Sequence, residues 1–222
     1  MNEEVLIPKM TRQQGKVTRK KIKISFLNLV IVLFCTLLIV GASFVNLDIR
    51  HYIIPADLFT NKNLTGADFV FRFFLIPQIP IVMFICSFLG KRMATTSVFL
   101  YIMAGLTIAP IFALGGGITY FFEYGCGYIL AYLPAVIIAG NLLNKYGFLD
   151  MIKATLAGVL TIHLLGILYM VVVALVKQIG SEFIYGWIVS QSGLKIVYDI
   201  ILSFLLIMFG KYFNKALKFV LE

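Results

Sequence analysis

Two ionisable side chains lie four residues apart near the start of the last apolar segment. Lys195 and Asp199 would share one face of a helix at this spacing. A charged side chain inside a membrane is costly and usually marks a binding site or an ion path. One interpretation therefore assigns the carboxylate of an anionic ligand to Lys195 and the N–H groups of a ligand to Asp199. The alternative is a lysine that extends toward the membrane surface and pairs with the neighbouring carboxylate.

A stretch rich in glycine and tyrosine runs from Leu114 to Leu133 and contains five glycines and four tyrosines. Glycines such as Gly116 and Gly117 are unfavourable in a helix but let the backbone approach a ligand closely. Tyrosines spaced four apart offer flat apolar faces with a hydroxyl at the edge, and these are Tyr120, Tyr124 and Tyr128. The stretch predicts the mouth of a ligand pocket between two helices. The alternative is an ordinary turn with interfacial aromatic side chains.

Three other side chains allow both a functional and a structural interpretation. Gln78 lies between Pro77 and Pro80, which should kink or unwind a helix, so its amide is a candidate for the pocket wall. His163 lies in the middle of an apolar run; a hydrogen bond to a neighbouring helix is expected, and a proton relay is the alternative. Trp187 is expected in the aromatic belt at the membrane interface.

The sequence has no motif for catalysis or for binding a cofactor. It lacks the HExxH, P-loop and GxSxG patterns and has only two histidines. Its three cysteines do not have the spacing of metal ligands and are expected to be structural. We therefore predict no metal and no cofactor. Any active transport would draw its energy from another subunit or from an ion gradient.

The composition predicts an integral membrane protein with one domain. Of the 222 residues 61% are hydrophobic and the mean hydropathy is +0.98, more apolar than a soluble domain of this size can bury. The net charge is +9, but seven of the 19 Lys and Arg residues fall within the first 23 residues. This distribution is typical of membrane topology and excludes a nucleic-acid-binding surface. The basic tail, residues 1–23, is expected to lie on anionic membrane lipids.

Residues 24–222 are predicted to be an all-α domain with six membrane spans, at about 25–46, 69–89, 95–114, 125–143, 152–176 and 193–213. Six spans place both termini on one side. That side would carry 14 Lys and Arg residues against five on the other, which indicates a topology with both termini in the cytoplasm. Three outward segments should then meet at one end. They are a candidate lid at residues 47–68, the glycine–tyrosine stretch and the loop before the last span.

Several motifs have the spacing of one transporter family. They are Leu-Gly-Lys-Arg at 89–92, Ala-Pro-Ile-Phe at 109–112, the glycine run at 115–117 and Tyr-Gly-Cys-Gly-Tyr at 124–128. From about residue 26 to 210 the chain resembles the BioY family, the biotin-specific S components of energy-coupling-factor (ECF) vitamin transporters. Lys195 matches the lysine that opens the family's last helix. Ser192 stands where the family has an aspartate, and Asp199 follows Lys195 by one turn.

The resemblance implies a substrate-binding subunit that captures biotin outside a bacterial plasma membrane. Its partners would be a transmembrane coupling protein and ATPase subunits, and the chain itself would not be an enzyme. An S component for another small vitamin is the alternative within the family. An intramembrane enzyme using Glu123, Asp199 or His163, or a membrane scaffold without transport activity, would be alternatives outside it.

Overall fold

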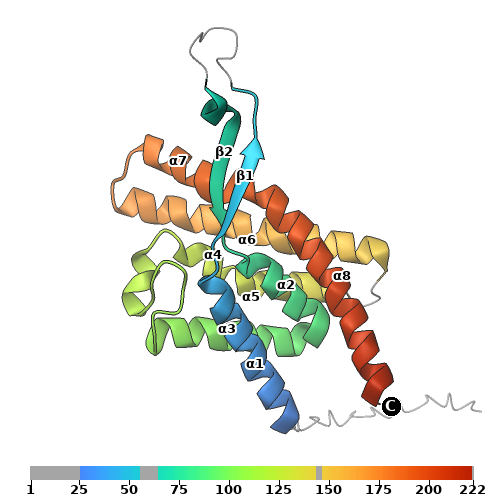
Figure 1. The fold of residues 1–222 in the computed structure, drawn as a ribbon. Helices are drawn as coiled ribbons and strands as arrows, with labels where there is room; N and C mark the ends of the chain where they lie inside the picture. Colours follow the sequence, from blue (N-terminus) through green and yellow to red (C-terminus); the bar gives the residue numbers. More distant parts are fainter. Residues whose placement is uncertain (1–25, 56–64, 144–146, 222) are drawn as a thin grey trace, which may run out of the picture.

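The computed structural model describes residues 26–55, 65–143 and 147–221, and most of them are helical. Eight α-helices and a two-stranded sheet form the described fold (Figure 1). The helices are α1 (Phe26–Ser43), α2 (Gln78–Leu89), α3 (Lys91–Thr107), α4 (Cys126–Leu130), α5 (Tyr132–Leu142), α6 (Phe148–Val176), α7 (Ser181–Ser192) and α8 (Lys195–Leu221). The strands are β1 (Leu47–Tyr52) and β2 (Val70–Leu75).

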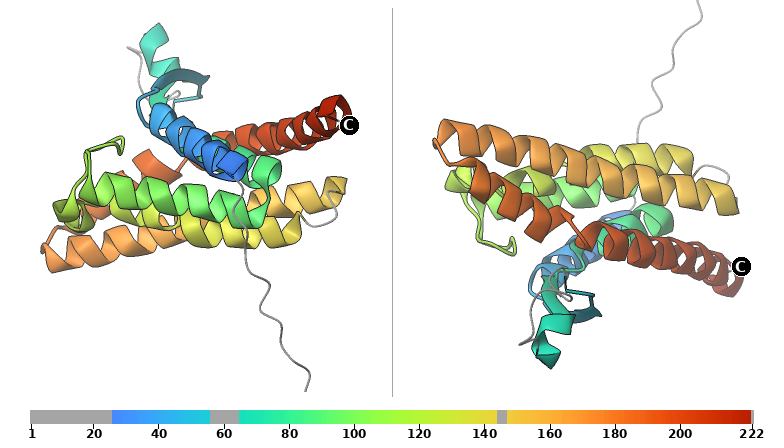
Figure 2. Two further views of the ribbon diagram at one scale, coloured as in Figure 1. Left: turned by 90° about the horizontal axis from the view of Figure 1, so that it is seen from below. Right: turned by 90° about the horizontal axis from the view of Figure 1, so that it is seen from above.

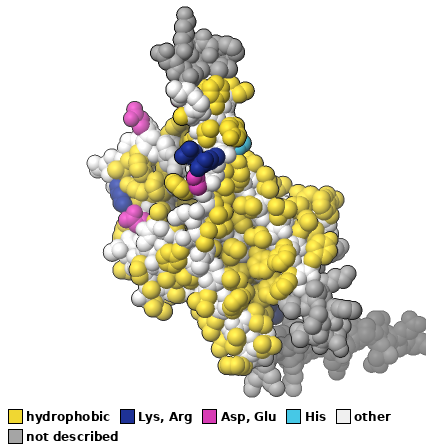
Figure 3. Space-filling model, in the orientation of Figure 1, with side chains coloured by type: hydrophobic (Ala, Val, Ile, Leu, Met, Phe, Trp, Pro, Cys, Tyr) yellow, Lys and Arg dark blue, Asp and Glu magenta, His cyan; other side chains and the backbone are white. Residues whose placement is uncertain are grey.

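The outer surface of the helical body is apolar. Three helical stretches have the length and composition to cross a membrane: Phe26–Ser43, Phe148–Val176 and Ser181–Asn214. Large apolar side chains along them are exposed, for example Leu37, Leu164 and Phe209. Figure 3 shows this apolar surface over the body, with charged side chains gathered near the hairpin and along one edge. Such a surface suits a lipid environment and would be a liability in water.

The helices pack in an order that does not follow the chain. α2 lies along α8, α6 packs against α4, α5 and α8, and α1 packs on α3. Side chains from these helices form one core that includes Met83, Tyr101 and Ile162, all fully buried. The β1–β2 hairpin projects from one side of the body, whereas α1 begins and α8 ends toward the opposite side (Figure 1).

The predicted second span is helical only in its second half. Residues 70–75 form β2, which pairs antiparallel with β1 so that Arg50 lies opposite Arg72. The prediction of an all-α chain is therefore wrong for this region. Phe73 and Leu75 are buried while Arg72 and Phe74 are exposed, an alternation that suits a strand with one covered face. Residues 56–64 of the candidate lid lie outside the described residues.

The two prolines around Gln78 begin a helix instead of kinking one. Pro77 precedes α2 and Pro80 lies in its first turn, where the backbone N–H groups have no partner within the helix. The predicted kink is therefore wrong, but the helix predicted over 69–89 is interrupted at Pro77, as the alternative of an unwound segment implied. The position still brings Gln78 to the junction between the hairpin and the helical body.

The other helix boundaries differ less from the predicted ones. α3 ends at Thr107, shortly before Pro110, and the chain then forms an irregular loop with a short 3-10 helix, η2 (Ile118–Phe122). Residues 181–192, where a loop was expected, form the helix α7. Figure 2 shows the loop after α3 and the turn between α6 and α7 at the same end of the molecule. Residues of the loop after α3 and of α7 line the site described next.

Candidate functional site

A cavity of about 600 Å³ lies where the hairpin, the loop after α3 and the α7–α8 junction meet. This volume is within the range of small-molecule sites. Its wall consists mainly of residues 71–76 and 113–114 and of some residues within 120–132 and 187–199. Asn46 and Gln78 also line it. Of the three segments predicted to meet, the glycine–tyrosine stretch and the segment before the last span line the cavity, whereas no described residue of the candidate lid does.

Five of the predicted site residues line this cavity, namely Gln78, Tyr120, Tyr128, Lys195 and Asp199. Three do not, and they have other contacts. Gly116 packs so closely on α3 that an added Cβ would lie 2.8 Å from the Gly105 carbonyl oxygen, and the Gly117 N–H donates to that same oxygen at 2.8 Å. Tyr124 packs against Trp187 and Phe183 behind the wall.

Gln78 joins four helices through its side-chain amide. Its Nε2 donates to the Ser43 hydroxyl of α1 and to the Tyr101 hydroxyl of α3, each at 2.6 Å. Its Oε1 accepts from the Tyr132 hydroxyl of α5 at 3.2 Å. Because each of these groups is buried, the network holds Gln78 and Tyr132 in one position on the cavity wall.

Tyr128 is placed by a close crossing of α4 and α6. At Gly166 an added Cβ would come within 2.5 Å of the Tyr128 ring, and at Gly127 it would come within 2.2 Å of Tyr169. Each tyrosine thus occupies space that a glycine on the opposite helix leaves open. The Tyr128 hydroxyl lies 2.8 Å from the Ser192 Oγ.

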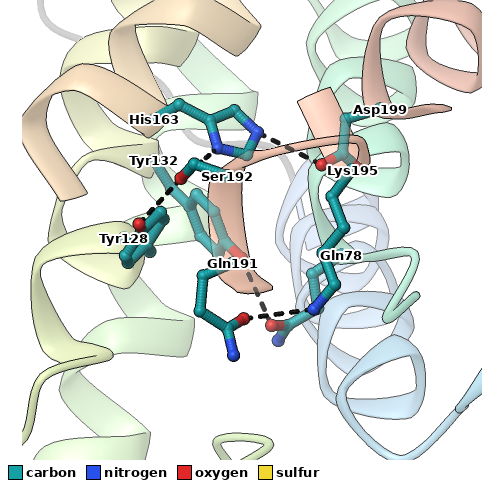
Figure 4. Close-up of polar contacts among 8 residues, drawn as sticks. All are labelled: Gln78, Tyr128, Tyr132, His163, Gln191, Ser192, Lys195 and Asp199. Carbon is teal, nitrogen blue, oxygen red and sulfur yellow. Dashed lines mark hydrogen bonds and ion pairs between the residues drawn. The ribbon is translucent and has the colours of Figure 1, made fainter. Parts of the chain in front are cut away.

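A buried histidine joins α6 to α7 and α8 beside the cavity (Figure 4). His163 Nδ1 lies 2.9 Å from the Ser192 Oγ, and Nε2 lies 3.2 Å from Asp199 Oδ2. The predicted hydrogen bond from His163 to a neighbouring helix is therefore confirmed. Asp199 Oδ1 is also buried and has no hydrogen-bond partner in the described part of the chain.

Lys195 and Asp199 do not pair with each other. The Lys195 Nζ donates to Gln191 Oε1 at 3.2 Å, while the carboxylate of Asp199 contacts His163 (Figure 4). The described structure therefore contains no direct ion pair between the two, although their charges lie close enough to interact. Lys195 is half-buried on the cavity wall.

Ser192, His163 and Asp199 contact one another in the order of a hydrolytic triad, but Ser192 is not on the cavity wall. Its Oγ is buried and also contacts the Tyr128 hydroxyl, so it faces other side chains and not the cavity. A nucleophile must reach the reacting atom. The described residues also contain no group of three His, Cys, Asp or Glu side chains that could hold a metal.

The contribution of α7 to the cavity was not predicted from the sequence. Trp187 and Gln191 line the cavity, and Trp187 Nε1 is a buried donor without a partner among the described residues. A usable signal was present, because Trp187, Gln191 and Lys195 are spaced four apart and so follow one face of a nearly continuous helix. Trp187 is therefore part of the cavity wall, beyond the interfacial role expected for it.

The hairpin is attached to α8 next to these residues. The His51 Nδ1 of β1 lies 3.0 Å from the Tyr198 hydroxyl, and Phe73 of β2 packs edge-on against the Tyr198 ring. Farther out, the backbone N–H and the hydroxyl of Thr65 donate to Asp68, which lowers the pKa of that carboxyl group. The hairpin thus closes one side of the cavity, whereas Thr65 and Asp68 are exposed.

The cavity has the kind of lining that is typical of a small-molecule binding site. Aromatic and aliphatic side chains supply most of its wall, and the charges come from two cations, Arg72 and Lys195, and one carboxylate, Asp199. Binding sites of this kind obtain affinity from apolar burial and orientation from a few polar groups. The described arrangement suits binding better than bond making or breaking.

Comparisons with known proteins agree with this architecture. The chain is similar in fold to a solved structure described as the S-component for biotin from an ECF-type ABC transporter, with a TM-score of 0.62 at 21% sequence identity. The match covers 85% of this chain and 91% of that one. Comparison with curated proteins gave no match. The BioY family matches residues 16–219, and the chain therefore belongs to the BioY family.

Proposed function

We propose that this protein is the substrate-binding S component of an ECF transporter and that its substrate is biotin. The observation that carries the proposal is the cavity that brings Lys195 and Asp199 together with the aromatic wall in a chain of the BioY family. The biotin S-component of similar fold supports the same conclusion. An S component for another small vitamin remains the alternative, and the charges of the wall favour one that carries a carboxylate.

Biotin complements the wall group by group. Its carboxylate pairs with Lys195, and an N–H of its urea-like ring donates to Asp199, whose Oδ1 has no partner among the described residues. Its thioether ring and aliphatic tail lie against Tyr120, Tyr128 and Trp187. Charge-assisted hydrogen bonds at the two ends would orient the ligand, and apolar burial would supply most of the affinity.

The protein works in the bacterial plasma membrane with both termini in the cytoplasm, so that the cavity opens to the outside. The distribution of Lys and Arg along the sequence supports this orientation. The exposed apolar surface of α1, α6 and α8 supports insertion in lipid. The partners are a transmembrane coupling protein and two ATPases, because the chain has no P-loop of its own.

Direct binding tests the proposal. The purified protein in detergent or nanodiscs is titrated with labelled biotin, and an excess of unlabelled biotin, thiamine or riboflavin is added as competitor. We expect saturable binding that only biotin and its close analogues displace. Saturable binding of another vitamin in place of biotin would favour the alternative within the family, and the absence of any vitamin binding would contradict the proposal.

Uptake tests the role of the partners. Cells that express the chain together with the coupling protein and the ATPases should concentrate biotin. An ATPase variant with its P-loop lysine replaced is the control and should abolish accumulation, because the lysine holds the nucleotide phosphates. Concentrative uptake by the chain in cells without any such partner would contradict the proposal.

A further inference from the structure

Four side chains from four helices form one chain of hydrogen bonds beside the cavity. It runs from the Tyr128 hydroxyl of α4 to Ser192 at the end of α7, then to His163 of α6 and Asp199 of α8 (Figure 4). The three contacts are 2.8, 2.9 and 3.2 Å long. The two ends, Tyr128 and Asp199, line the cavity, whereas Ser192 and His163 do not.

In one arrangement of donors and acceptors, every hydrogen in this chain of hydrogen bonds has an acceptor. A carboxylate accepts, so His163 donates its Nε2–H to Asp199. In a neutral imidazole the other nitrogen, Nδ1, is then an acceptor, and the Ser192 hydroxyl donates to it. The Ser192 oxygen is left to accept the hydrogen of the Tyr128 hydroxyl.

The opposite direction would leave a hydrogen unused. If both nitrogens of His163 were protonated, Nδ1 would donate to Ser192 and Ser192 would donate to Tyr128. The Tyr128 hydrogen would then have no acceptor among the described residues, since Ser192 is its one hydrogen-bonded neighbour there. Tyr128 is only partly buried on the cavity wall, and the first direction is the one that pairs every hydrogen of the chain within the described protein.

We propose that Ser192 and His163 are positioning residues that make the Tyr128 hydroxyl a hydrogen-bond acceptor toward the ligand. The ring of Tyr128 is held by its contact with Gly166, so its oxygen cannot move far from the wall. With its hydrogen donated to Ser192, this oxygen presents only lone pairs to the cavity. The site then selects a ligand with an N–H donor at this point. The inference rests on the proposed function and assigns the donor to the urea-like ring of biotin.

The test compares biotin with two derivatives, each methylated on one ring nitrogen and so lacking one N–H. The parent protein should prefer biotin to at least one derivative. Tyr128→Phe removes the acceptor. Ser192→Ala removes the oxygen that accepts the Tyr128 hydrogen, so that this hydrogen can turn toward the ligand. Each substitution should reduce the preference for biotin by about two- to tenfold, the worth of one hydrogen bond. The double variant should lose no more than Tyr128→Phe alone.

Two matched substitutions separate this role from simple packing. Both His163→Asn and His163→Gln remove the ring. The amide of asparagine reaches the position of Nδ1 and can accept from Ser192, whereas the amide of glutamine reaches the position of Nε2 and cannot. The asparagine variant should therefore keep more of the preference for biotin than the glutamine variant.

The outcomes differ clearly. Equal loss of preference in the asparagine and glutamine variants, or an unchanged preference in Ser192→Ala, would overturn the inference. Size-exclusion profiles and thermal unfolding of each purified variant establish that it is folded. A parent protein that does not bind biotin would contradict the proposed function itself, whereas a parent that binds biotin but shows no preference over either derivative would contradict only the inference drawn here.

Discussion

The ring of Tyr128 lies so close to the backbone of Gly166 in α6 that no side chain fits at position 166. An added Cβ at position 166 would approach Cγ and Cδ1 of the ring to 2.5 Å. These ring atoms are close to the Cβ of Tyr128, so a small movement of the hydroxyl group cannot relieve the contact. The geometry of the cavity wall therefore depends on a residue that does not touch the cavity.

Gly166→Ala should weaken biotin binding by displacing Tyr128. Overpacking of a filled site costs about 1–3 kcal/mol, so thermal unfolding of the purified protein should also shift to lower temperature. Gly41→Ala is the control, because nothing lies within 4 Å of a Cβ at that position in α1 and alanine favours a helix. Unchanged affinity and stability in Gly166→Ala would contradict the close crossing of α4 and α6.

Lys195→Ala should weaken binding of biotin by roughly ten- to a hundredfold, since a hydrogen bond to a charged group contributes about 1.5–3 kcal/mol. The methyl ester of biotin lacks the negative charge. It should bind the parent protein less well and be nearly indifferent to the substitution. Titration calorimetry with both ligands measures the difference.

Lys177→Ala is a matched control for Lys195→Ala. The Lys177 Nζ lies 4.6 Å from the centre of the Tyr124 ring and is not on the cavity wall. Its loss should leave the affinities for acid and ester close to those of the parent. If Lys195→Ala weakens acid and ester equally, the lysine supports α7 through Gln191 and does not bind the carboxylate.

Asp199→Asn should weaken the acid and the ester of biotin alike. The substitution keeps the size of the side chain and an oxygen that can accept from His163. It places an NH₂ group where Oδ1 now lies, which would face a ligand N–H with another donor. A loss of about tenfold or more is expected for both ligands. A loss confined to the acid would assign Asp199 to the support of Lys195.

The orientation in the membrane is tested by cysteine labelling in intact cells. A cysteine at Gly180, in the turn before α7, should react with an impermeant maleimide from outside, whereas one at Lys145, outside the described residues, should not. The native cysteines Cys35, Cys86 and Cys126 are at most 1% exposed, so their background should be low. Labelling at position 145 from outside, without labelling at 180, would invert the proposed topology.

Most of the helical content and much of the site could be predicted from the sequence. Ionisable and amide side chains within apolar runs are rare, which is why Gln78, Lys195 and Asp199 stood out. All three line one cavity, where the start of α2 and the start of α8 lie beside the hairpin. The helix-joining role of His163 followed from the cost of leaving a polar side chain unpaired in an apolar environment.

The hairpin could not be predicted in the same way. Residues 70–75 are as apolar as a membrane helix, and average hydropathy does not distinguish the two conformations. What decides for a strand is pairing with residues 47–52, a contact between distant parts of the chain. α7 was missed because its serines, glycine and glutamine are typical of a loop; it is a helix whose Trp187 and Gln191 face the cavity. The contact of Ser192 with His163 likewise joins residues 29 positions apart.

Trp187 is the single tryptophan in the chain, and it lies on the cavity wall against Tyr124 and Phe183. Its indole N–H has no partner among the described residues, and a ligand bound in the proposed site would change its surroundings. The intrinsic tryptophan fluorescence of the protein therefore comes from one side chain on the cavity wall. The protein carries its own optical probe, and ligand entry can be timed in a stopped-flow instrument without attaching a dye.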